Sequence, residues 1–477
     1  MRRILALLLA AWVALWPAHV MADPLTPAQA TRELRILERA LRDLHPGLYR
    51  YQTAAGLEAE FAAARAAVAQ SAEPGTLFLL ATRISASIRC GHTWTNPLNQ
   101  GPAMQALLSN LPALPARVRL LQGRLLVTAS TDPALPGDTE ILAIDGRRVP
   151  ELVDTLMPYL RADGGSDGKR LSQIDSVEEG GALDRLLPLL HPPVAGRYRL
   201  AVRAPDGTER EAVVSAQSVA VREAALRATG RPPQDMAWRF AVEGDTATLT
   251  LPTFAFWNDG FDWKTFLQDA FETLAKARTP RLVIDLRQNE GGDDAIGRAL
   301  VAYLIDRPYR VPAGRVESAY ERVPYDLARY LDTWDFGFFD RTGQVRKQAG
   351  GNWLLEAQPP AMTVMPGAPR YRGTVIALVG PRMSSAGFLL ARDLQASGAA
   401  TLVGEPTGGN LRGLNGGQLA WLTLPYSGVA VDIPLLATVH AGAPDAGIQP
   451  DVLVETTVED VLARRDPALE TAVRLGR

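Results

Sequence analysis

Apolar residues in the first hundred positions of the chain recur at helical spacing. Between Thr26-Pro27, a capping residue followed by proline, and the breaker His45-Pro46-Gly47, four leucines lie three or four residues apart and so share one helix face. They are Leu34, Leu37, Leu41 and Leu44. Two more helices are expected, at about 55–70 and 75–88. The pattern predicts an N-terminal helical domain, a small bundle, over residues 23–105.

The pattern changes over residues 106–216, where short apolar runs alternate with turn residues such as Asp145-Gly146. Strands are predicted at 118–121, 124–127 and 141–144, and a hairpin at 197–202. Gly137-Asp138 together with Leu142–Val149 (LAIDGRRV) resembles the middle of a PDZ domain, although the glycine-rich carboxylate-binding loop of such domains is not visible. We therefore expect a PDZ-like, β-rich middle segment, followed by a linker at 217–234.

Strands and helices alternate from residue 235 to residue 477. Near-continuous apolar runs are typical of strands that are covered on both faces. Such runs occupy 246–251, 282–286, 374–379 and 401–403. Helices are predicted at 262–277, 294–305, 386–397, 457–464 and 467–475. This alternation predicts an α/β domain, and with the preceding segments a multidomain α/β protein.

The first 22 residues have the pattern of a signal peptide. Arg2 and Arg3 precede an apolar run, Ile4 to Trp16, that is too short to span a bilayer, and Ala22 ends a cleavage sequence. We expect cleavage before Asp23 and a periplasmic or secreted protein without membrane attachment. A retained N-terminal anchor is the alternative.

Composition narrows the classes of function. The formal net charge of -2 over 477 residues gives no indication of a nucleic-acid partner, which usually needs a basic patch. Cys90 is the only cysteine, which excludes an intramolecular disulfide and the common multi-cysteine zinc sites. The HExxH motif is absent as well, and we expect neither a metal nor an organic cofactor.

Ser384 and Ser385 lie in a tight turn between the apolar run 374–379 and a helix-period segment. A serine at such a turn exposes its hydroxyl, and the free N–H groups and positive dipole end of the helix lie behind it. Those groups favour a developing oxyanion, which makes Ser385 a candidate nucleophile for acyl transfer. Ser384 is a rival, and an ordinary helix cap is the alternative role for Ser385.

Four elements of the rear region together resemble the C-terminal-processing, or tail-specific, serine peptidase family. They read LVIDLRQNEGGDD (282–294), MSSAGF (383–388), TLVGEPTGGN (401–410) and GIQPDVLV (447–454). The resemblance implies that residues 235–477 form a ClpP/crotonase-like α/β peptidase domain. It also implies hydrolysis of peptide bonds by a serine, without a cofactor.

Many members of this family carry a lysine 25 residues after the serine, where this chain has Asn410. An amide cannot accept a proton at useful pH, so that base is lost. The tricorn-like members use a histidine from the N-terminal region instead, and the sequence CGHT places His92 at the matching position. Imidazole titrates near neutral pH and so suits a general base. The tricorn protease has a serine directly before its histidine, where this chain has Gly91.

A histidine base needs an acid to orient it. In the resembled subgroup that acid comes just before the G-x-x-P-D element, and Asp445, two residues before Gly447, is the candidate. Asp451 and Glu405 are alternatives for the acid, and His440 is a rival base.

Two backbone N–H groups are expected to form the oxyanion hole. The candidates are those of Ala386, which follows the nucleophile, and of Gly291, because glycine allows a close backbone approach. Cys90 is a possible second nucleophile, but we expect it to be a small buried apolar residue.

These features predict an exported serine-type peptidase that acts on peptides or unfolded proteins through an acyl-enzyme. The lost lysine and the many aromatic residues at 320–339 leave a carrier of apolar ligands open, since repeats of interphotoreceptor retinoid-binding protein resemble this scaffold. An esterase or amidase for small molecules is a third possibility, because the acyl chemistry is shared. The oligomeric state is not predicted.

Overall fold

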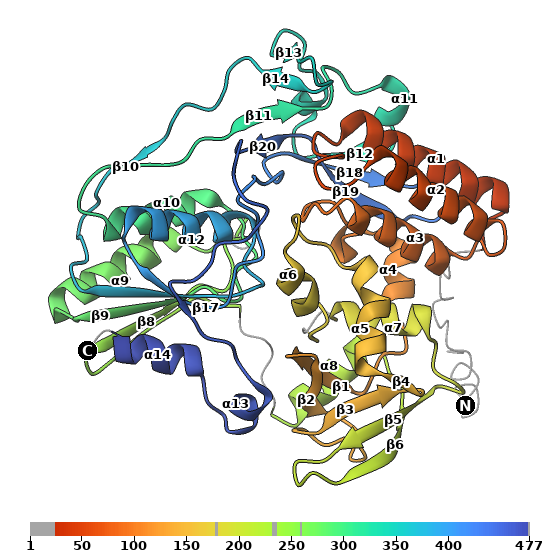
Figure 1. The fold of residues 1–477 in the computed structure, drawn as a ribbon, viewed down its shortest axis with the longest axis horizontal. Coiled ribbons are helices and arrows are strands. Elements are labelled where there is room, and N and C mark those ends of the chain that lie inside the picture. The colour runs from red at the N-terminus through yellow and green to blue at the C-terminus, as the bar shows by residue number, and fades with distance from the viewer. Residues whose placement is uncertain (1–23, 177–179, 231–235, 258–259, 476–477) are drawn as a thin grey trace, which may run out of the picture.

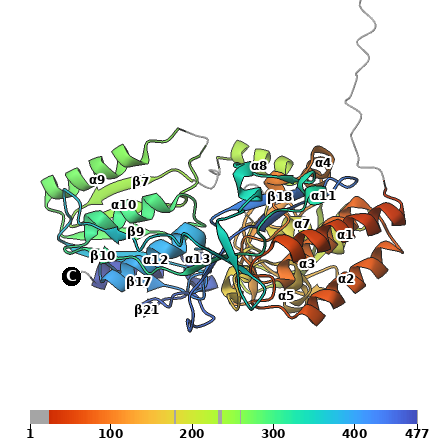
Figure 2. The same ribbon diagram turned by 90° about the horizontal axis from the view of Figure 1, so that it is seen from above.

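The computed structural model describes residues 24–176, 180–230, 236–257 and 260–475. The predicted signal peptide, residues 1–22, lies outside this part. Seen from above, the molecule has two lobes, one built on the front helices and the middle segment and the other on the rear sheet (Figure 2). Within the described residues, no helix combines the length and the apolar character that crossing a bilayer requires.

The predicted front helices are confirmed. They are α1 (Pro27–Leu44), α2 (Ala54–Val68) and α3 (Pro74–Ser87), and α4 (Pro102–Ser109) follows them. α1 begins with the expected capping box, in which the side chains of Thr26 and Gln29 each accept a hydrogen bond from the other's backbone N–H. Its leucine stripe is buried, as helical spacing requires.

The front helices complete their hydrophobic core with strands from late in the chain (Figure 1). Residues of α1, α2 and α3 share one buried cluster with residues of the three-stranded sheet β12–β18–β19. These strands are β12 (Leu331–Asp332), β18 (Leu419–Thr423) and β19 (Ala430–Pro434). Burying an aliphatic side chain contributes about 1.5–3 kcal/mol, so this shared core fixes the front helices to the rear of the chain.

The middle segment is an antiparallel sheet of order β1-β2-β3-β5-β6, with β4 paired to β3. The strands are β1 (Ala116–Leu121), β2 (Arg124–Ser130), β3 (Glu140–Ile144), β4 (Arg147–Arg148), β5 (Arg197–Arg203) and β6 (Glu209–Ser215). Three helices that the sequence pattern did not predict accompany it: α5 (Val149–Leu156), α6 (Asp167–Ser172) and α7 (Ala182–Leu190). The strands predicted at 118–144 and the hairpin are confirmed.

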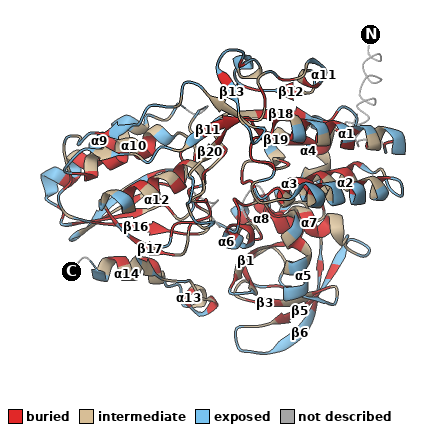
Figure 3. Ribbon diagram, turned by 45° about the horizontal axis from the view of Figure 1, so that its top comes forward, coloured by how far each residue is buried: buried red, intermediate tan, exposed pale blue. Residues whose placement is uncertain are grey.

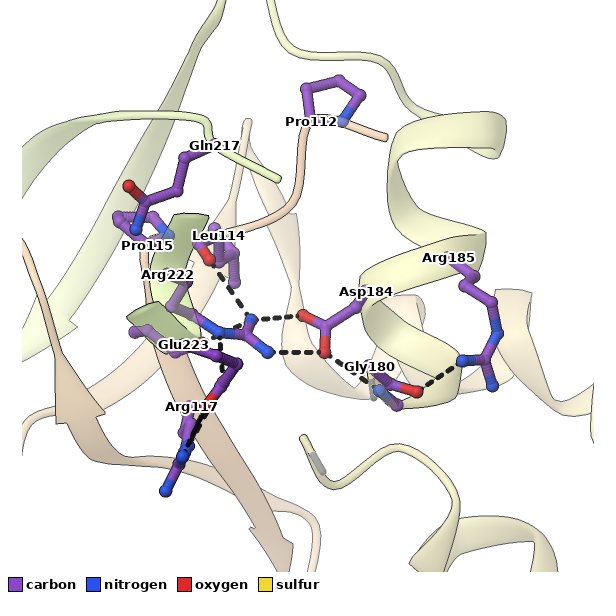
Figure 4. A network of polar contacts seen from close by, with 12 residues as sticks. Pro112, Leu114, Pro115, Arg117, Gly180, Asp184, Arg185, Gln217, Arg222 and Glu223 are labelled. Atoms are coloured by element: carbon purple, nitrogen blue, oxygen red, sulfur yellow. Dashed lines mark hydrogen bonds and ion pairs between the residues drawn. The ribbon is translucent and has the colours of Figure 1, made fainter. Parts of the chain in front are cut away.

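The segment expected to be a linker contains a helix, α8 (Val219–Ala228), that buried ion pairs hold against the middle segment (Figure 4). Arg222 is fully buried, and its guanidinium donates to Asp184 of α7 at 2.7 and 3.1 Å and to Glu223 at 3.0 Å. Glu223 in turn accepts from Arg117 of β1. α8 is therefore packed as part of the middle segment.

The rear unit is a six-stranded sheet of order β21-β17-β16-β9-β8-β7, parallel except for the β7–β8 pair. Its strands are β7 (Arg239–Glu243), β8 (Thr246–Thr250), β9 (Arg281–Asp285), β16 (Thr374–Val379), β17 (Thr401–Gly404) and β21 (Val452–Leu453). Helices α9 (Trp263–Ala277), α10 (Asp294–Leu304) and α12 (Ser385–Ser397) pack on one face and α14 (Pro467–Leu475) on the other (Figure 1). α13 (Val458–Leu462) precedes α14. The predicted apolar strands are confirmed, and Figure 3 shows β16 and β17 as buried.

A long insertion between β9 and β16 supplies the remaining small strands. They are β10 (Tyr309–Arg310), β11 (Arg315–Ser318), β13 (Val345–Lys347), β14 (Trp353–Leu355) and β15 (Thr363–Val364), and β20 (Ala437–Val439) joins β11. The insertion also contains the short helices α11 (Tyr325–Ala328) and η3 (Phe336–Phe339). Two further short helices lie outside it, η1 (Pro97–Asn99) in the front region and η2 (Met157–Tyr159) in the middle segment. Of the insertion's aromatic residues, Tyr320 is buried in the core shared with the front helices, whereas Trp334 and Phe336 are exposed. Packing thus accounts for part of this aromatic cluster.

Candidate active site

Ser385 lies where β16 turns into α12, in the segment 380–386, called here the nucleophile turn. Ser385 is the first residue of α12 and has a φ of +49°, in the left-handed region that non-glycine residues rarely adopt. Ser384 is the N-cap residue, but its hydroxyl makes no capping bond and donates instead to the carbonyl of Glu290 at 3.1 Å. Ser385 is thus held in a strained turn and is not a helix cap, and it remains partly exposed.

The structure brings both proposed oxyanion residues next to Ser385. Gly291 has a φ of +108°, and a Cβ atom there would lie 2.6 Å from Ser385 Cβ and 2.9 Å from the backbone nitrogen of Ala386. Only glycine allows this approach. The N–H of Gly291 donates to Asn289 Oδ1 at 2.9 Å, while Ala386 lies in the first turn of α12, where N–H groups have no partner within the helix.

The turn that carries Asn410 packs directly on the nucleophile turn. The N–H of Gly408 donates to the carbonyl of Met383 at 2.8 Å, and a Cβ atom at Gly409 would lie 2.4 Å from the ring of Phe388. Asn410 is fully buried, and its amide donates to Asp445 Oδ1 at 2.7 Å. The position of the family's lysine is therefore occupied by a hydrogen-bond donor that cannot act as a base.

His92 lies in the turn after α3, and this turn is fixed against the rear part of the chain. The backbone of Trp94 accepts a hydrogen bond from the N–H of Asp432 in β19 at 2.9 Å. The backbone of Gly416 passes so close to the imidazole that a Cβ atom there would lie 2.3 Å from Nε2. Nδ1 is buried and has no hydrogen-bond partner among the described residues. The Nε2 edge thus faces the rear segment.

Burial and charged neighbours together lower the pKa of His92 from its ordinary value. Burial is the largest cause, the carboxylate of Asp163 opposes it, and the cations Arg161 and Lys169 add to it. A lowered pKa keeps the imidazole neutral at neutral pH, which is the form that accepts a proton.

Asp163 supplies the negative charge that opposes the lowering of the pKa of His92, and the sequence pattern did not single this residue out. Its side chain is buried and accepts a hydrogen bond from the N–H of Gly91 at 2.8 Å. A Cβ atom at Gly91 would lie 2.5 Å from Asp163 Oδ2. Gly91 therefore makes room for this carboxylate.

Asp445 lies beside Asn410 in a polar cluster that also includes the backbone of Asp163. It accepts hydrogen bonds from Asn410 and from the N–H of Gly165 at 3.0 Å, and Asn410 also donates to the carbonyl of Asp163 at 3.3 Å. The predicted acid and Asp163 are thus linked through one buried amide.

The rival residues have other environments. Asp451 accepts from the backbone N–H of Leu402 at 2.7 Å, which is a structural role. Glu405 lies near Glu455 and Asp175, and burial together with these charges raises its pKa. His440 lies against Gly314, where a Cβ atom would be 3.0 Å from its ring. Cys90 is buried, and burial raises the pKa of its thiol, which makes it a poor nucleophile.

A cavity of about 270 Å³ opens beside the start of α12. Its lining includes Ala386, Phe388 and Asn410 from the two packed turns, together with apolar residues of the insertion such as Val311 and Met362. The cavity therefore adjoins the proposed oxyanion hole. The described residues hold no cluster of metal-binding side chains.

Part of the chain matches a known family, and the fold resembles solved structures. Residues 245–454 match the sequence model of peptidase family S41. The fold is similar to that of mature CPAF complexed with lactacystin, at 16% identity over 94% of this chain and 98% of that chain, with a TM-score of 0.66. It is also similar to a second structure of mature CPAF, at 16% identity over 94% and 97% of the chains, with a TM-score of 0.64.

A putative peptidase from Parabacteroides merdae is more distant, with 12% identity over 94% and 96% of the chains and a TM-score of 0.45. The predicted resemblance to the tail-specific serine peptidases is thus confirmed by the matching family. Residues 245–454 match peptidase family S41, and the chain that carries them is a serine-type peptidase.

Proposed function

We propose that the protein cleaves peptides or unfolded proteins by a Ser385–His92 mechanism with an acyl-enzyme intermediate. His92 accepts the proton of the Ser385 hydroxyl as the serine attacks the scissile carbonyl. The backbone N–H groups of Ala386 and Gly291 receive the oxyanion, Gly291 by releasing its bond to Asn289. The protonated imidazole then donates its proton to the leaving amine. Water attacks the acyl-enzyme with the imidazole again as base, and the Ser385 hydroxyl is released when the imidazole returns the proton.

The observation that carries this proposal is the strained placement of Ser385 at the start of a helix, with Gly291 pressed against it. Residues held at unfavourable dihedral angles concentrate at active sites. The lowered pKa of His92 and the loss of the lysine at Asn410 both support imidazole as the base. Asp163 is our candidate for the orienting acid, and Asp445, behind Asn410, is the second candidate.

The remaining expectations belong to the same proposal. The signal peptide at 1–22 implies export to the periplasm or beyond. We propose a helical domain at 23–105, a PDZ-like domain at 106–216, a connection at 217–234 that includes α8, and a ClpP/crotonase-like domain at 235–477. The antiparallel sheet of the middle segment supports a β-rich domain at 106–216.

The apolar-carrier alternative has less support. The cavity beside Ala386, at about 270 Å³, is smaller than the 300–1,000 Å³ typical of small-ligand pockets, and charged residues such as Arg298 and Asp393 line part of it. A substrate side chain fits such a site better than a large apolar ligand does. Comparing turnover of peptides and of p-nitrophenyl esters separates a peptidase from an esterase.

Fluorophosphonate labelling tests the mechanism without knowledge of the substrate. We expect the wild-type protein to be labelled at Ser385 and the variants Ser385→Ala and His92→Ala to lose labelling. Ser397→Ala is the matched control, because it removes a hydroxyl at the other end of α12 and should leave labelling in place. Persistent labelling of both the Ser385 and the His92 variants would rule the mechanism out.

A further inference from the structure

A buried lysine of the middle segment contacts both loops that build the proposed site. Lys169 lies on α6, and its side chain is only 3% exposed. Its Nζ atom lies 2.8 Å from Glu290 Oε2 and donates to the carbonyl of Arg382, also at 2.8 Å. Glu290 directly precedes Gly291, and Arg382 belongs to the nucleophile turn. One ammonium group thus joins the two segments on either side of Ser385.

The stem of Lys169 contacts a third segment of the site. A Cβ atom at Gly408 would lie 2.9 Å from Lys169 Cβ, so this lysine packs on the turn that leads to Asn410. An ammonium group has three hydrogen-bond donors, and two of those on Lys169 are directed at fixed acceptors of the rear unit. Burying a charged amine costs free energy unless it is paired, and these contacts provide the pairing.

The position of Glu290 sets the position of the proposed oxyanion hole. Its carboxylate binds Lys169, with Arg161 3.5 Å away, and its carbonyl accepts the hydroxyl of Ser384. The side chain of Glu290 is 42% exposed, yet desolvation of its carboxylate acts to raise its pKa; the charges of Lys169 and Arg161 outweigh this effect and lower the pKa to about 2. Burial lowers the pKa of Lys169 to about 8, so both partners are mostly ionised at pH 7.

We propose that Lys169 is a positioning residue of the acyl-transfer site, whose ammonium group holds the Glu290–Gly291 loop and the nucleophile turn in the geometry that attack at Ser385 requires. This inference rests on the proposed function and goes beyond it. It assigns a role in positioning to a residue outside the region that matches the peptidase family.

Lys169 also acts on the base through its charge. The groups that face His92 are Asp163, which favours the imidazolium, and Arg161 and Lys169, which disfavour it. Removing the charge of Lys169 therefore raises the pKa of His92, and the acid limb of the pH–rate profile moves to higher pH. A lysine with a purely structural role would not move that limb in a folded variant.

The test is the rate of inactivation by a fluorophosphonate probe, measured against pH for the full chain. Lys169→Met is expected to slow inactivation by about 10²-fold, the loss typical of a small misplacement of reacting groups. It is also expected to move the acid limb of the pH–rate profile to higher pH. Lys169→Arg keeps the charge, so its limb stays in place. Lys276→Met is the matched control, since Lys276 forms an exposed pair with Glu272 on α9.

The Glu290→Gln variant tests the same ion pair from its other partner. We expect it to fold, because this side chain is 42% exposed and the substitution conserves its shape. The double variant Lys169→Met/Glu290→Gln is expected to react no more slowly than the slower single variant, as for two residues that act as a unit. A Lys169→Met protein that unfolds at the wild-type temperature and reacts like the Lys276→Met control would overturn the inference. Losses that multiply in the double variant would also overturn it.

The two proposals fail in different ways. If the wild-type protein is not labelled at Ser385, the proposed function is wrong and this inference falls with it. If the wild-type protein is labelled and the Glu290→Gln and Lys169→Met proteins match the control in rate and pH profile, only the role of Lys169 is wrong.

Discussion

The nucleophile and the base of the proposed site come from two regions that are built in different ways. Ser385 is placed by local structure, because β16, the nucleophile turn and α12 follow one another within residues 374–397. His92 is placed by contacts between distant parts of the chain, because the front helices share their core with β12, β18 and β19. The rear region thus presents a reactive group by itself, whereas the front region needs the rest of the fold to position its imidazole.

The two candidates for the acid proposed to orient His92 also come from different regions. Asp163 comes from the middle segment and Asp445 from the rear, and Asn410 connects them. We expect Asp163→Asn to lower kcat by about 10⁴-fold, the loss seen when the acid of a catalytic triad becomes an amide, and Asp445→Asn to lower it far less. Turnover or probe inactivation of the two variants measures this. The reverse order would assign the acid to Asp445.

Damage to the middle segment should reduce stability and leave the local geometry of Ser385 intact. Arg222→Met leaves Asp184 and Glu223 without their shared buried partner, and we expect it to lower the free energy of unfolding by about 3–5 kcal/mol. Urea unfolding measures the change. Arg148→Met is the matched control, because that arginine is 72% exposed in its pair with Glu151 and such pairs contribute about 0–1 kcal/mol. Equal losses in the two variants would contradict the assignment of a buried network.

Gly416 offers a way to disturb the base without touching a catalytic side chain. A methyl group there would lie 2.3 Å from His92 Nε2, so we expect Gly416→Ala to slow probe inactivation by about 10²-fold. The neighbouring Gly417→Ala is the matched control, since a Cβ atom at Gly417 has no heavy atom within 4 Å. If both variants react at the same rate, Nε2 does not face Gly416 in the working enzyme.

The front region should also carry its own pH dependence of stability. Burial and then the charge of Arg50 lower the pKa of His45 from 6.5 to about 3. Between these values the unfolded chain binds a proton that the folded chain excludes, so stability falls as pH drops through this range, by about 1.4 kcal/mol per unit. Urea unfolding at pH 7, 6 and 5 should show stability falling with pH, most steeply below pH 6, and His45→Gln should reduce this fall without abolishing it, because the pKa of His92 is lowered as well. An unchanged slope in that variant would place the titration elsewhere.

What the sequence could predict follows the same division between regions. Strand runs, the Ser385 turn and the capping box at Thr26 were predictable because they depend on neighbours in the sequence. The segment that forms helix α8 was expected to be a linker. This helix is held by a buried pair of Arg222 with Asp184, which lies far away in the sequence, so the local pattern did not reveal it. Asp163 and Lys169 were missed for the same physical reason. Gly91 was the signal for Asp163, because it stands where a larger residue would meet that carboxylate.

The structure of the fluorophosphonate adduct tests most directly whether the front imidazole and the rear hydroxyl work together. The account predicts a covalent bond to Ser385 Oγ and His92 Nε2 within about 3 Å of that oxygen, or slightly further if the adduct displaces the ring. An adduct on another residue would contradict the Ser385–His92 mechanism. So would an imidazole more than about 10 Å from Ser385 Oγ, because that distance is beyond the reach of a hydrogen bond.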